Sequence, residues 1–593
     1  MHVTSLFPAL PPLPDLNVYN TIFGRPDQAE WPDYTMQIDD RTGRKRTFFE
    51  VKERAGWGAT ALGAPVSVGG LGLQGGTDEI IGVIGFNSFE FFDLSVSLLR
   101  IAVPFALIST YSTRRELLHG LKLTKATRLF VDAKLLKNVL AAIEDPDVHI
   151  SPENVYVLAG TAPKGRKSFA GMVQSVQRKK VDVEGVRPAS RDTLAYLVMS
   201  SGTSGLPKAV MISHGNLLGS AMQAIVIAQS LEPFLTAKPT AAPTTIACLP
   251  MFHSYGLHVY ILRATLAPAT FILLEKWNTV QYLKAIPKSV LSFPAFGIPD
   301  APFRRYKITH LILVPSLIHQ VVNHPELKKT DLSSVIFVNS GAAYLPPQLF
   351  KQMSGYLQQS AEMSQGYGLS ECTLSAHSRL PGGAFGIPGG SPSYSTGVLN
   401  AGMEARIVRE DGTDAELGEV GELWLRGPNV ALGYWNNPKA NAETFLPGGW
   451  LRTGDQFSVD ENGFFFFADR GKDTLKVSGV QVSPKEIEDV LFAHPDKLVS
   501  DVTVAGVSGG RTADEKIPRA WVVLSAPGRK LGKEEVVRSL ERWHQEQLSR
   551  YKWLRGGIEI VREIPKTPTG KTIRRLLQDE YEKKNARKSK AKL

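Results

Sequence analysis

The stretch SSGTSGLPK, from Ser200 to Lys208, holds residue types that bind a polyphosphate. Glycines without a Cβ let backbone N–H groups close around an anion, and hydroxyl groups add further donors. Lys208 supplies positive charge. The spacing differs from a Walker A loop, so this segment alone also allows a glycine-serine turn without a ligand. The residues that would form the phosphate cradle are Ser200, Ser201, Gly202, Thr203, Ser204 and Gly205.

Two other glycine-rich segments are weaker candidates for a nucleotide site. GLGLQG, from Gly70 to Gly75, has the G-x-G-x-x-G pattern, but it precedes the strand-like run EIIGVIGF instead of following a strand. GTAPKGRKS, which begins at Gly160, misses the Walker A pattern because Arg166 separates the glycine from Lys167. We predict that both segments are ordinary loops.

The elements around the Ser200 segment indicate an α/β fold. LAYLVMS before it and AVMIS after it are typical strands, and similar short runs rich in β-branched residues recur with spacings long enough for helices. This rhythm predicts largely parallel sheets in the first part of the chain. The runs are EIIGVIGF, TRLFVDA, NVYVLAG, TTIACLP, THLILVP and SVIFVNSG.

The pattern changes near residue 400 to alternating, turn-rich strands, which predict an antiparallel, barrel-like subregion. Beyond it we expect a small α+β C-terminal domain with a helix at Pro484 to Ala493. Strands around VTVAGV and PRAWVVLS follow, and then a helix at KEEVVRSLERWHQEQL.

Composition excludes several classes of protein. With 593 residues, 43% of them hydrophobic, the chain can bury more than one core. Its two cysteines, Cys248 and Cys372, cannot form a disulfide framework or a CxxC site, which indicates a reducing compartment. We predict no transmembrane segment, because no apolar run reaches the roughly 18 to 20 residues that span a bilayer. The N-terminal stretch PALPPLPDL does not resemble a secretion signal.

The net charge of +11 is concentrated in the last segment, KKNARKSKAKL, which has six basic residues and no acid. Since no nucleic-acid motif accompanies this charge, we expect a solvated, flexible basic tail and no nucleic-acid partner. The final tripeptide AKL is close to the peroxisomal S-K-L signal. We therefore predict binding to a peroxisomal import receptor, with the cytoplasm as the alternative location.

Taken with the segments after it, the Ser200 segment closely resembles the phosphate loop of the adenylate-forming superfamily. That superfamily includes acyl-CoA synthetases, 4-coumarate-type CoA ligases, firefly-type luciferases and peptide-synthetase adenylation domains. Matching motifs run in the family order and cover most of the chain: PMFHSYGL, NSGAAYL, SQGYGLSECT, WLRTGD, FFFFADRGKD and PKTPTGKTIRR. The resemblance implies a protein that uses ATP, Mg²⁺ and CoA.

The resemblance implies roles for residues of the first three motifs. His253 would lie at the mouth of the acid pocket, and Tyr255 and Gly256 would line it. Ser370 would contact phosphate, and Glu371 would hold Mg²⁺, which one carboxylate does together with substrate phosphates and waters. The adenine site would comprise Gly341, Ala342, Ala343, Gln365, Gly366 and Tyr367, with the tyrosine stacked on the base.

The later motifs imply the rest of the site. Asp455 would accept hydrogen bonds from the ribose, Arg470 would help to hold the nucleotide, and Lys571 would reach the substrate carboxylate and the α-phosphate. The thioester-forming step would use Lys476 and Gly479, with Lys276 at the CoA phosphate. Lys472 matches the family hinge, so we predict an N-terminal domain over 1–469, a hinge at 470–472 and a mobile C-terminal domain over 473–593.

The implied reaction is an ATP-dependent ligation of a carboxylic acid to CoA through an acyl-adenylate. Three alternatives share these motifs: loading of a carrier protein, a luciferase-like oxygenase, and a nucleotide-binding regulator without catalysis. The small Gly256 and the AKL end favour a fatty or elongated aryl acid as substrate. The inserted segment PKSVLSFPAFGIPDAPF, at 287–303, is longer than the family's connection and is expected to be a surface loop.

Overall fold

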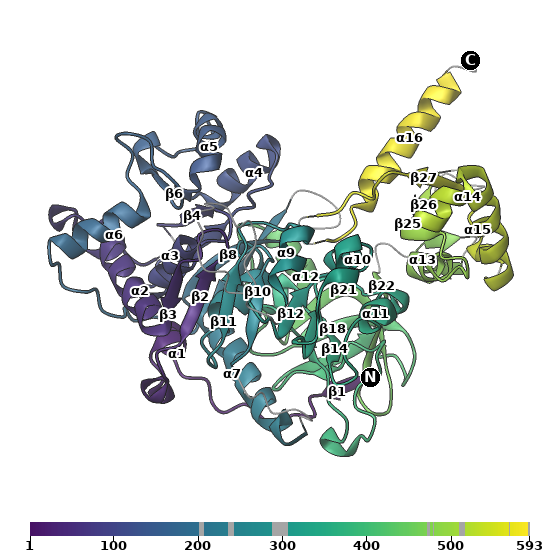
Figure 1. Ribbon diagram of the computed structural model, residues 1–593, viewed down its shortest axis with the longest axis horizontal. Coiled ribbons are helices and arrows are strands. Elements are labelled where there is room, and N and C mark those ends of the chain that lie inside the picture. The colour runs from purple at the N-terminus through teal and green to yellow at the C-terminus, as the bar shows by residue number, and fades with distance from the viewer. Residues whose placement is uncertain are drawn as a thin grey trace.

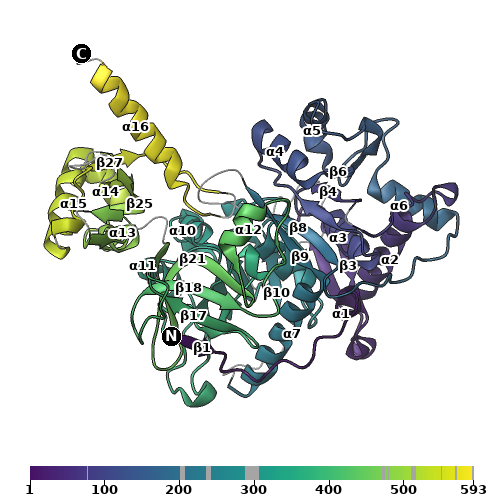
Figure 2. The same cartoon turned by 180° about the vertical axis from the view of Figure 1, so that it is seen from behind.

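The computed structural model describes residues 1–76, 78–200, 207–234, 242–287, 306–470, 475–477, 480–508, 516–548, 550–567 and 570–590. Figure 1 shows a large body of sheets and helices, with a smaller lobe formed by the last strands and helices. Figure 2 shows the same two parts from behind. The architecture is the expected one, with parallel-rich α/β sheets, a curled antiparallel half-barrel and a small C-terminal α+β domain.

The first sheet has the strand order β19-β9-β8-β5-β4-β6-β7, and neighbours among β4 to β8 are parallel. Both runs that flank the Ser200 segment are strands as predicted, and β9 turns back antiparallel to β8, so the two form a hairpin. The strands are β4 (Ile81–Ile84), β5 (Phe105–Leu107), β6 (Arg128–Val131), β7 (Val155–Val157), β8 (Leu194–Ser200), β9 (Lys208–Ser213) and β19 (Gly433–Tyr434).

Helices cover this sheet, and the two weaker glycine-rich segments are loops between elements, as predicted. GLGLQG lies ahead of β4, and GTAPKGRKS joins β7 to a helix. Thr47 caps the first of the long helices through a reciprocal capping box with Glu50. The helices are α2 (Phe48–Gly63), α3 (Phe89–Arg100), α4 (Arg114–Thr124), α5 (Leu136–Ile143), α6 (Phe169–Arg178) and α7 (His214–Leu231).

The second sheet has the order β14-β13-β12-β10-β11-β2-β3 and is parallel except at β2–β3. Its strands are β2 (Thr35–Asp39), β3 (Lys45–Thr47), β10 (Thr244–Ala247), β11 (Thr270–Leu273), β12 (His310–Leu313), β13 (Phe337–Ser340) and β14 (Glu362–Gln365). The helices between them include α8 (Ser254–Leu257), which continues into the π-helical turn η6 (His258–Leu262), and α9 (Thr279–Ala285), α10 (Pro315–Val322) and α11 (Pro347–Ser354).

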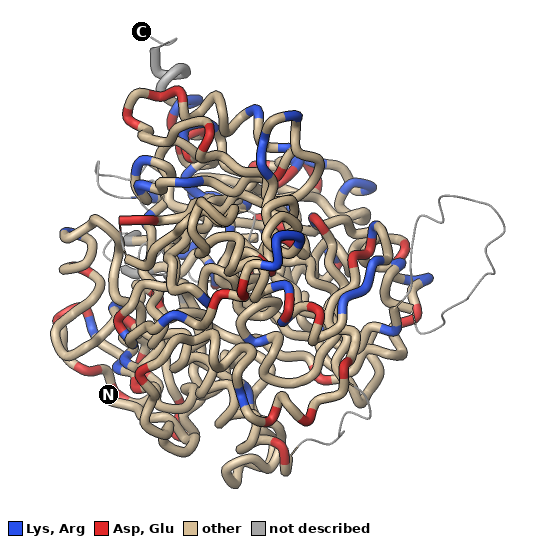
Figure 3. The backbone as a smooth tube through the Cα atoms, turned by 90° about the vertical axis from the view of Figure 1, so that its left-hand side faces the viewer, with Lys and Arg blue, Asp and Glu red and all other residues tan. Residues whose placement is uncertain are grey.

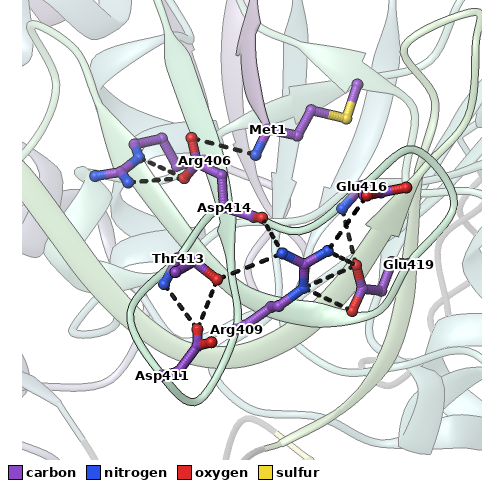
Figure 4. Close-up of polar contacts among 8 residues, drawn as sticks. All are labelled: Met1, Arg406, Arg409, Asp411, Thr413, Asp414, Glu416 and Glu419. Carbon is purple, nitrogen blue, oxygen red and sulfur yellow. Dashed lines mark hydrogen bonds and ion pairs between the residues drawn. The ribbon is translucent and has the colours of Figure 1, made fainter.

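The antiparallel half-barrel begins near residue 400, as the alternating pattern predicts, and also takes in the first residues of the chain. Strand β1 (His2–Thr4) pairs with β17 (Glu404–Val408). Figure 4 shows how charges hold this edge: Asp414 lies 2.7 Å from Nη2 of Arg406 and 3.3 Å from the amine of Met1. The other elements are β18 (Gly421–Arg426), β20 (Phe445–Leu446), β21 (Trp450–Val459), β22 (Phe465–Arg470) and α12 (Pro438–Thr444).

The C-terminal lobe packs helices against a sheet of order β25-β26-β27. The helix predicted at Pro484 to Ala493 ends one residue earlier, because Ala493 forms the cap. The elements are β23 (Leu475–Val477), β24 (Val480–Val482), α13 (Pro484–Phe492), β25 (Val499–Val507), β26 (Ile517–Leu524), α14 (Ala526–Leu531), α15 (Lys533–Gln547), β27 (Ile558–Val561) and α16 (Arg574–Lys590). Because residues 471–474 lie outside the described ranges, the hinge at Lys472 stays a prediction.

The basic tail differs from the flexible segment expected from its composition. It continues helix α16 as far as Lys590, and this helix projects from the lobe in Figure 1. Glu582 accepts a hydrogen bond from the Ser508 N–H at 2.8 Å, and Lys584 lies 2.9 Å from Glu580 and 3.1 Å from Glu559. Such i,i+4 contacts and contacts between strand and helix stabilise α16, although its many like charges disfavour a helix.

On the side drawn in Figure 3, basic and acidic positions are interspersed along the described chain and form no single basic patch. No helix within the described ranges is long and apolar enough to cross a membrane. The AKL tripeptide lies outside the described residues, so peroxisomal import stays a sequence-based prediction.

Candidate active site

Glu371 lies at the loop end of the β8–β9 hairpin, beside Ser200, where the sequence predicts phosphate and metal binding. It is 8% exposed and begins the short turn η8 (Ser370–Cys372) together with Ser370. The hydroxyls of Ser200 and Tyr434 both donate to its Oε1, each at 2.8 Å. Two donors fix one oxygen of the carboxylate, and no side-chain hydrogen bond to its other oxygen comes from the described residues, which suits a group that binds a cation.

This arrangement fits Mg²⁺ as the resemblance implies. Magnesium is usually held by one or two carboxylates together with substrate phosphates and waters. The described part of the chain contains no cluster of three or more His, Cys, Asp or Glu residues that forms a complete protein cage. Glu371 would therefore hold the ion only in the presence of phosphate oxygens.

The hairpin also positions Lys208 close to this carboxylate. Ser200 and Lys208 are paired in the register of β8 and β9, at the two ends of the segment 201–206. The Lys208 ammonium lies 4.5 Å from the ring centroid of Tyr434, the tyrosine that binds Glu371. The predicted cradle residues Ser201, Gly202, Thr203 and Ser204 lie outside the described residues.

A cavity of about 570 Å³ is lined by most of the residues predicted for the adenine site. The Tyr367 hydroxyl donates to Oδ2 of Asp455 at 2.7 Å, and Asp455 is 5% exposed. Ala342 has a left-handed φ of 68°, a strained conformation typical of ligand-binding backbone. The described predicted residues that line this cavity are His253, Tyr255, Gly341, Ala342, Gln365, Gly366, Tyr367, Ser370 and Lys571.

The strand pair β21–β22 brings Asp455 directly opposite Arg470. The two residues are not neighbours in the sequence, but the antiparallel pairing places their backbones side by side. They lie next to the cavity that Tyr367 lines. The side chain of Arg470 is outside the description, and so is that of Lys476, whose backbone lies in β23. Gly479 is not described.

His253 carries a neutral ring at the edge of the cavity. Burial, and secondarily the positive charge of Lys571, lowers the pKa of His253 from 6.5 to about 3. Its Nδ1 accepts the N–H of Tyr255 at 3.3 Å, so the hydrogen-bond pattern assigns the ring proton to Nε2. The ring can therefore donate a hydrogen bond at neutral pH without carrying charge.

Lys571 enters this cavity from the C-terminal lobe. A tight turn presents it: the Thr567 N–H donates to the Lys571 carbonyl at 2.7 Å, and the Lys571 N–H donates to Oγ1 of Thr567 at 3.0 Å. The turn packs on helix α10, because a Cβ added at Gly570 would lie 2.2 Å from Oγ of Ser316. Lys571 thus acts electrostatically on the ring of His253, although it follows His253 by almost 320 positions in the chain.

A second cavity, of about 550 Å³, meets the first one at His253, which lines both. Lys276, the residue expected at a CoA phosphate, lies in its wall. Apolar residues form much of the rest, among them Met199 and Trp277. The wall also includes Lys566 and Thr567 from the segment that carries Lys571, so both cavities lie beside the C-terminal lobe.

Among the residues predicted for the acid and adenine sites, Gly256 and Ala343 do not line these cavities. Gly256 faces the protein interior, where an added Cβ would lie 2.1 Å from the Pro250 carbonyl oxygen. Its small size therefore serves packing of the backbone and carries no information about the length of the acid. Ala343 is next to Ala342 but is not part of the cavity wall.

The sequence reasoning missed Arg263, Ser375 and Arg379, which line the first cavity. Arg263 is the single charged residue in the run LHVYILRATL, Leu257 to Leu266. One charge within an apolar run is a signal for a buried functional group, and here it follows a predicted substrate residue by ten positions. Ser375 and Arg379 carry no comparable local signal.

The fold and the site define an AMP-forming ligase of the adenylate-forming type. The AMP-binding enzyme family model matches residues 25–435, and the AMP-binding enzyme C-terminal domain model matches residues 486–571. The chain belongs to this family of AMP-binding enzymes, within the adenylate-forming acid–CoA ligases.

Several known proteins are similar to this chain over most of its length. Probable 4-coumarate–CoA ligase 1 of Dictyostelium discoideum is 30% identical, with 84% of this chain and 85% of the relative covered. Peroxisomal OPC-8:0-CoA ligase 1 of Arabidopsis thaliana is 30% identical, with 95% of this chain and 93% of the relative covered. The fold matches that of the anthranilate CoA ligase AuaEII bound to anthranoyl-AMP, with a TM-score of 0.78, 23% identity, and 97% and 99% of the chains covered.

Proposed function

We propose that the protein is an ATP-dependent acyl- or aryl-CoA ligase that activates a carboxylic acid as an acyl-adenylate and then transfers the acyl group to the thiol of CoA. The single observation that carries this proposal is the pair of cavities that meet at His253. One holds the predicted nucleotide and acid residues, and the other is the approach for a second substrate.

In the first step, an oxygen of the substrate carboxylate attacks the α-phosphorus of ATP and pyrophosphate leaves. Lys571 stabilises the charge on the carboxylate and the α-phosphate, because it lines the cavity beside His253. Asp455 holds the ribose, and Tyr367 orients Asp455 through their 2.7 Å hydrogen bond. Mg²⁺, when bound at Glu371, would neutralise phosphate charge. Positioning and charge neutralisation account for most of the catalysis in such a step.

In the second step, the thiol of CoA attacks the acyl carbonyl and AMP leaves. The thiol reaches the carbonyl from the Lys276 cavity, past His253. The neutral ring with its proton on Nε2 can donate a hydrogen bond to the carbonyl oxygen. The C-terminal domain would rotate about Lys472 between the steps, so that Lys571 leaves and the face with Lys476 and Gly479 approaches.

The acid is a fatty or elongated aryl acid in this proposal. A cavity of about 570 Å³ exceeds what a nucleotide's base and sugar need and leaves room for an acyl group. CoA as the acceptor is supported by Lys276 in the wall of the second cavity. Several similar proteins are named for CoA ligation, including the relatives from Dictyostelium discoideum and Arabidopsis thaliana.

The test is a panel of fatty, cinnamic and benzoic acids, with release of pyrophosphate measured with and without CoA. We expect pyrophosphate release that depends on the acid, and AMP together with an acyl-CoA thioester when CoA is present. Acylation of a carrier protein, without any thioester formed on CoA, would show that the acceptor is the carrier protein and not CoA. Oxygen consumption or light with an adenylated acid would instead identify an oxygenase.

A further inference from the structure

We propose that Arg263 is a specificity-determining residue that binds a second anionic group, at the far end of the acid substrate. The inference rests on the proposed ligase function and adds the chemical class of the acid. The substrate would be a carboxylic acid that carries another carboxylate, or an equivalent anionic oxygen group, separated from the reacting carboxyl by an apolar spacer.

Arg263 lines the same cavity as His253, Tyr367 and Lys571. Its Nη2 donates to Oγ of Ser220 at 3.0 Å, to the Ser220 carbonyl at 3.5 Å and to Oγ of Ser375 at 3.4 Å, and all of these partners are neutral. Its Nε is buried and has no hydrogen-bond partner among the described residues. No carboxylate of the described residues lies within 4.0 Å of its guanidinium. The positive charge therefore lacks a counterion in the part of the protein that the structure describes.

Arg46, another enclosed arginine, has a carboxylate partner of a kind that Arg263 lacks among the described residues, whereas Arg379 has only neutral partners. Arg46 lies 2.8 Å from Asp93 in an ion pair that is almost fully buried. Arg379, in the wall of the same cavity, donates to the backbone carbonyls of Ser391 at 2.5 Å and Pro392 at 3.1 Å. Burial of an uncompensated charge costs several kcal/mol, so such groups are normally paired. The uncompensated charge at Arg263, whose Nε also lacks a partner among the described residues, is explained when the substrate supplies the missing anion.

Arg263 stays protonated in this position near neutral pH. Burial lowers its pKa from 12.5 to about 10, and the nearby Tyr255 opposes part of that shift. Glu362 is an acid that also lines the cavity, but no ion pair joins it to Arg263 among the described residues. The guanidinium thus presents a permanent charge and a planar set of donors, which matches a carboxylate in two-point geometry.

The helical segment α8–η6 places Arg263 away from the reacting end. His253 caps the start of the segment and Arg263 caps its end, so an α-helical rise of 1.5 Å per residue sets an upper limit of about 15 Å on the backbone separation, which the π turn shortens. Tyr255, Val259 and Arg263 occur at intervals of four and all line the cavity. The π turn, in which the Arg263 N–H donates to the His258 carbonyl at 2.7 Å, is wider than an α turn and keeps Arg263 on this face.

Val259 lies between the two charged ends, beside Ile227 and Leu231 from α7. An apolar wall between two polar ends fits a substrate with an apolar middle and an oxygen anion at each end. A simple fatty acid would leave its terminal methyl group against the guanidinium, which would desolvate the charge without pairing it. The cavity therefore favours a bifunctional acid over a monofunctional acid of equal length.

The experiment compares α,ω-dicarboxylic acids of graded chain length with their half-methyl esters, which match them in length but lack the second charge. Pyrophosphate release gives kcat/KM for each acid. At the chain length that reaches Arg263, we expect the wild-type protein to favour the diacid over its half-ester by about 10- to 100-fold, as expected for a charge-assisted hydrogen bond. Arg263→Met should abolish this ratio through a higher KM for the diacid, and Arg263→Lys should retain part of it.

Arg191→Met is the matched control, because the Arg191 side chain is 59% exposed and outside both cavities. It should leave the ratio unchanged. Equal kcat/KM for diacids and half-esters at every length in the wild-type protein would overturn the inference, even if Arg263→Met failed to fold. An unchanged ratio in folded Arg263→Met would overturn it as well. If no acid at all releases pyrophosphate, the proposed function itself fails, which is a different outcome.

Discussion

At the scale of single residues, two lysines of the site differ in how they approach the reacting atoms. Lys571 lines the cavity beside His253, whereas Lys208 lies over the ring of Tyr434 at the hairpin. Lys571→Ala should lower acid-dependent pyrophosphate release by about 10²- to 10³-fold, because it removes charge stabilisation that develops in the transition state. Thioester formation from pre-made acyl-adenylate and CoA should be spared.

Lys208→Ala is the matched comparison for that prediction. It removes a positive charge beside the same carboxylate network, so we expect a loss of adenylation at least tenfold smaller than that of Lys571→Ala. Both half-reactions are measured in each variant. Equal losses in the two steps for Lys571→Ala, or an equally severe loss in Lys208→Ala, would contradict the roles given to these lysines.

Individual residues differ in how far the sequence could predict their positions. Glu371 and Asp455 could be located because they lie in motifs with a fixed order, and the structure places them near Ser200 and Tyr367. The position of Gly256 could not be deduced, since its size reflects a close approach to the Pro250 carbonyl, which depends on tertiary packing. The missing counterion of Arg263 likewise appears only when segments far apart in the chain surround it.

At the scale of elements, the start of helix α7 joins the hairpin of the phosphate segment to the half-barrel. Asn216 completes a capping box with Ser213, and its Nδ2 donates to the carbonyls of Val430 at 2.7 Å and Pro428 at 3.1 Å. Asn216→Ala leaves these carbonyls without that partner, so the free energy of unfolding should fall by about 2 to 3 kcal/mol. Urea denaturation of the folded variant measures the loss.

Glu50 offers the control for this element. It belongs to the capping box of α2 with Thr47, but it is exposed, and no hydrogen bond or ion pair joins its side chain to a further element among the described residues. Glu50→Ala should lower the free energy of unfolding by about 0.5 to 1 kcal/mol, the ordinary effect of a lost cap. A loss in Asn216→Ala no larger than this would show that the contact to residues 428–430 adds no stability.

Elements themselves were predictable where local chemistry decides them. The β-branched runs form the parallel strands, and the amphipathic run from Lys533 forms α15. The order of strands in each sheet was not predictable, because it depends on which segments pair over long distances, as β1 with β17 does. Helix α16 was missed because contacts from Ser508 and Glu559 compensate its dense positive charge.

At the scale of the whole molecule, buried histidines should make stability depend on pH. Burial lowers the pKa of His214 and of His310 from 6.5 to about 4, and those of His253 and His377 to about 3. The unfolded chain binds protons below pH 6.5 while the folded protein does not, so stability falls as the pH drops from 6.5 toward 4. Each group contributes on the order of 1 kcal/mol at pH 5.5.

Melting temperatures between pH 7.5 and 5 measure this dependence. His214→Asn is the informative variant, because the Asn side-chain oxygen can still accept the Val18 N–H, which now donates to Nδ1 of His214 at 3.1 Å. This variant should show a smaller decrease of Tm with falling pH than the wild-type protein. An identical slope in both proteins would mean that His214 does not contribute to the acid sensitivity.

The relation between the C-terminal lobe and the main body can be tested at Gly570. Its φ of 82° favours glycine, and an added Cβ would lie 2.2 Å from Oγ of Ser316 in helix α10. Gly570→Ala therefore disfavours the arrangement in which Lys571 enters the acid cavity. We expect acid-dependent pyrophosphate release to fall by about 10- to 100-fold while thioester formation from acyl-adenylate persists.

Two comparisons separate the clash from backbone strain. Gly532 has a φ of 94° with nothing within 4 Å of an added Cβ, so Gly532→Ala introduces strain into the same lobe without a clash and should leave the ratio of the two half-reactions unchanged. Adding Ser316→Gly to Gly570→Ala removes the two atoms nearest to the Cβ, leaves Cγ2 of Val314 at 3.3 Å, and should restore much of the adenylation. If the double variant adenylates no better than Gly570→Ala alone, then contact with α10 does not govern the entry of Lys571, and the loss must come from strain in the turn.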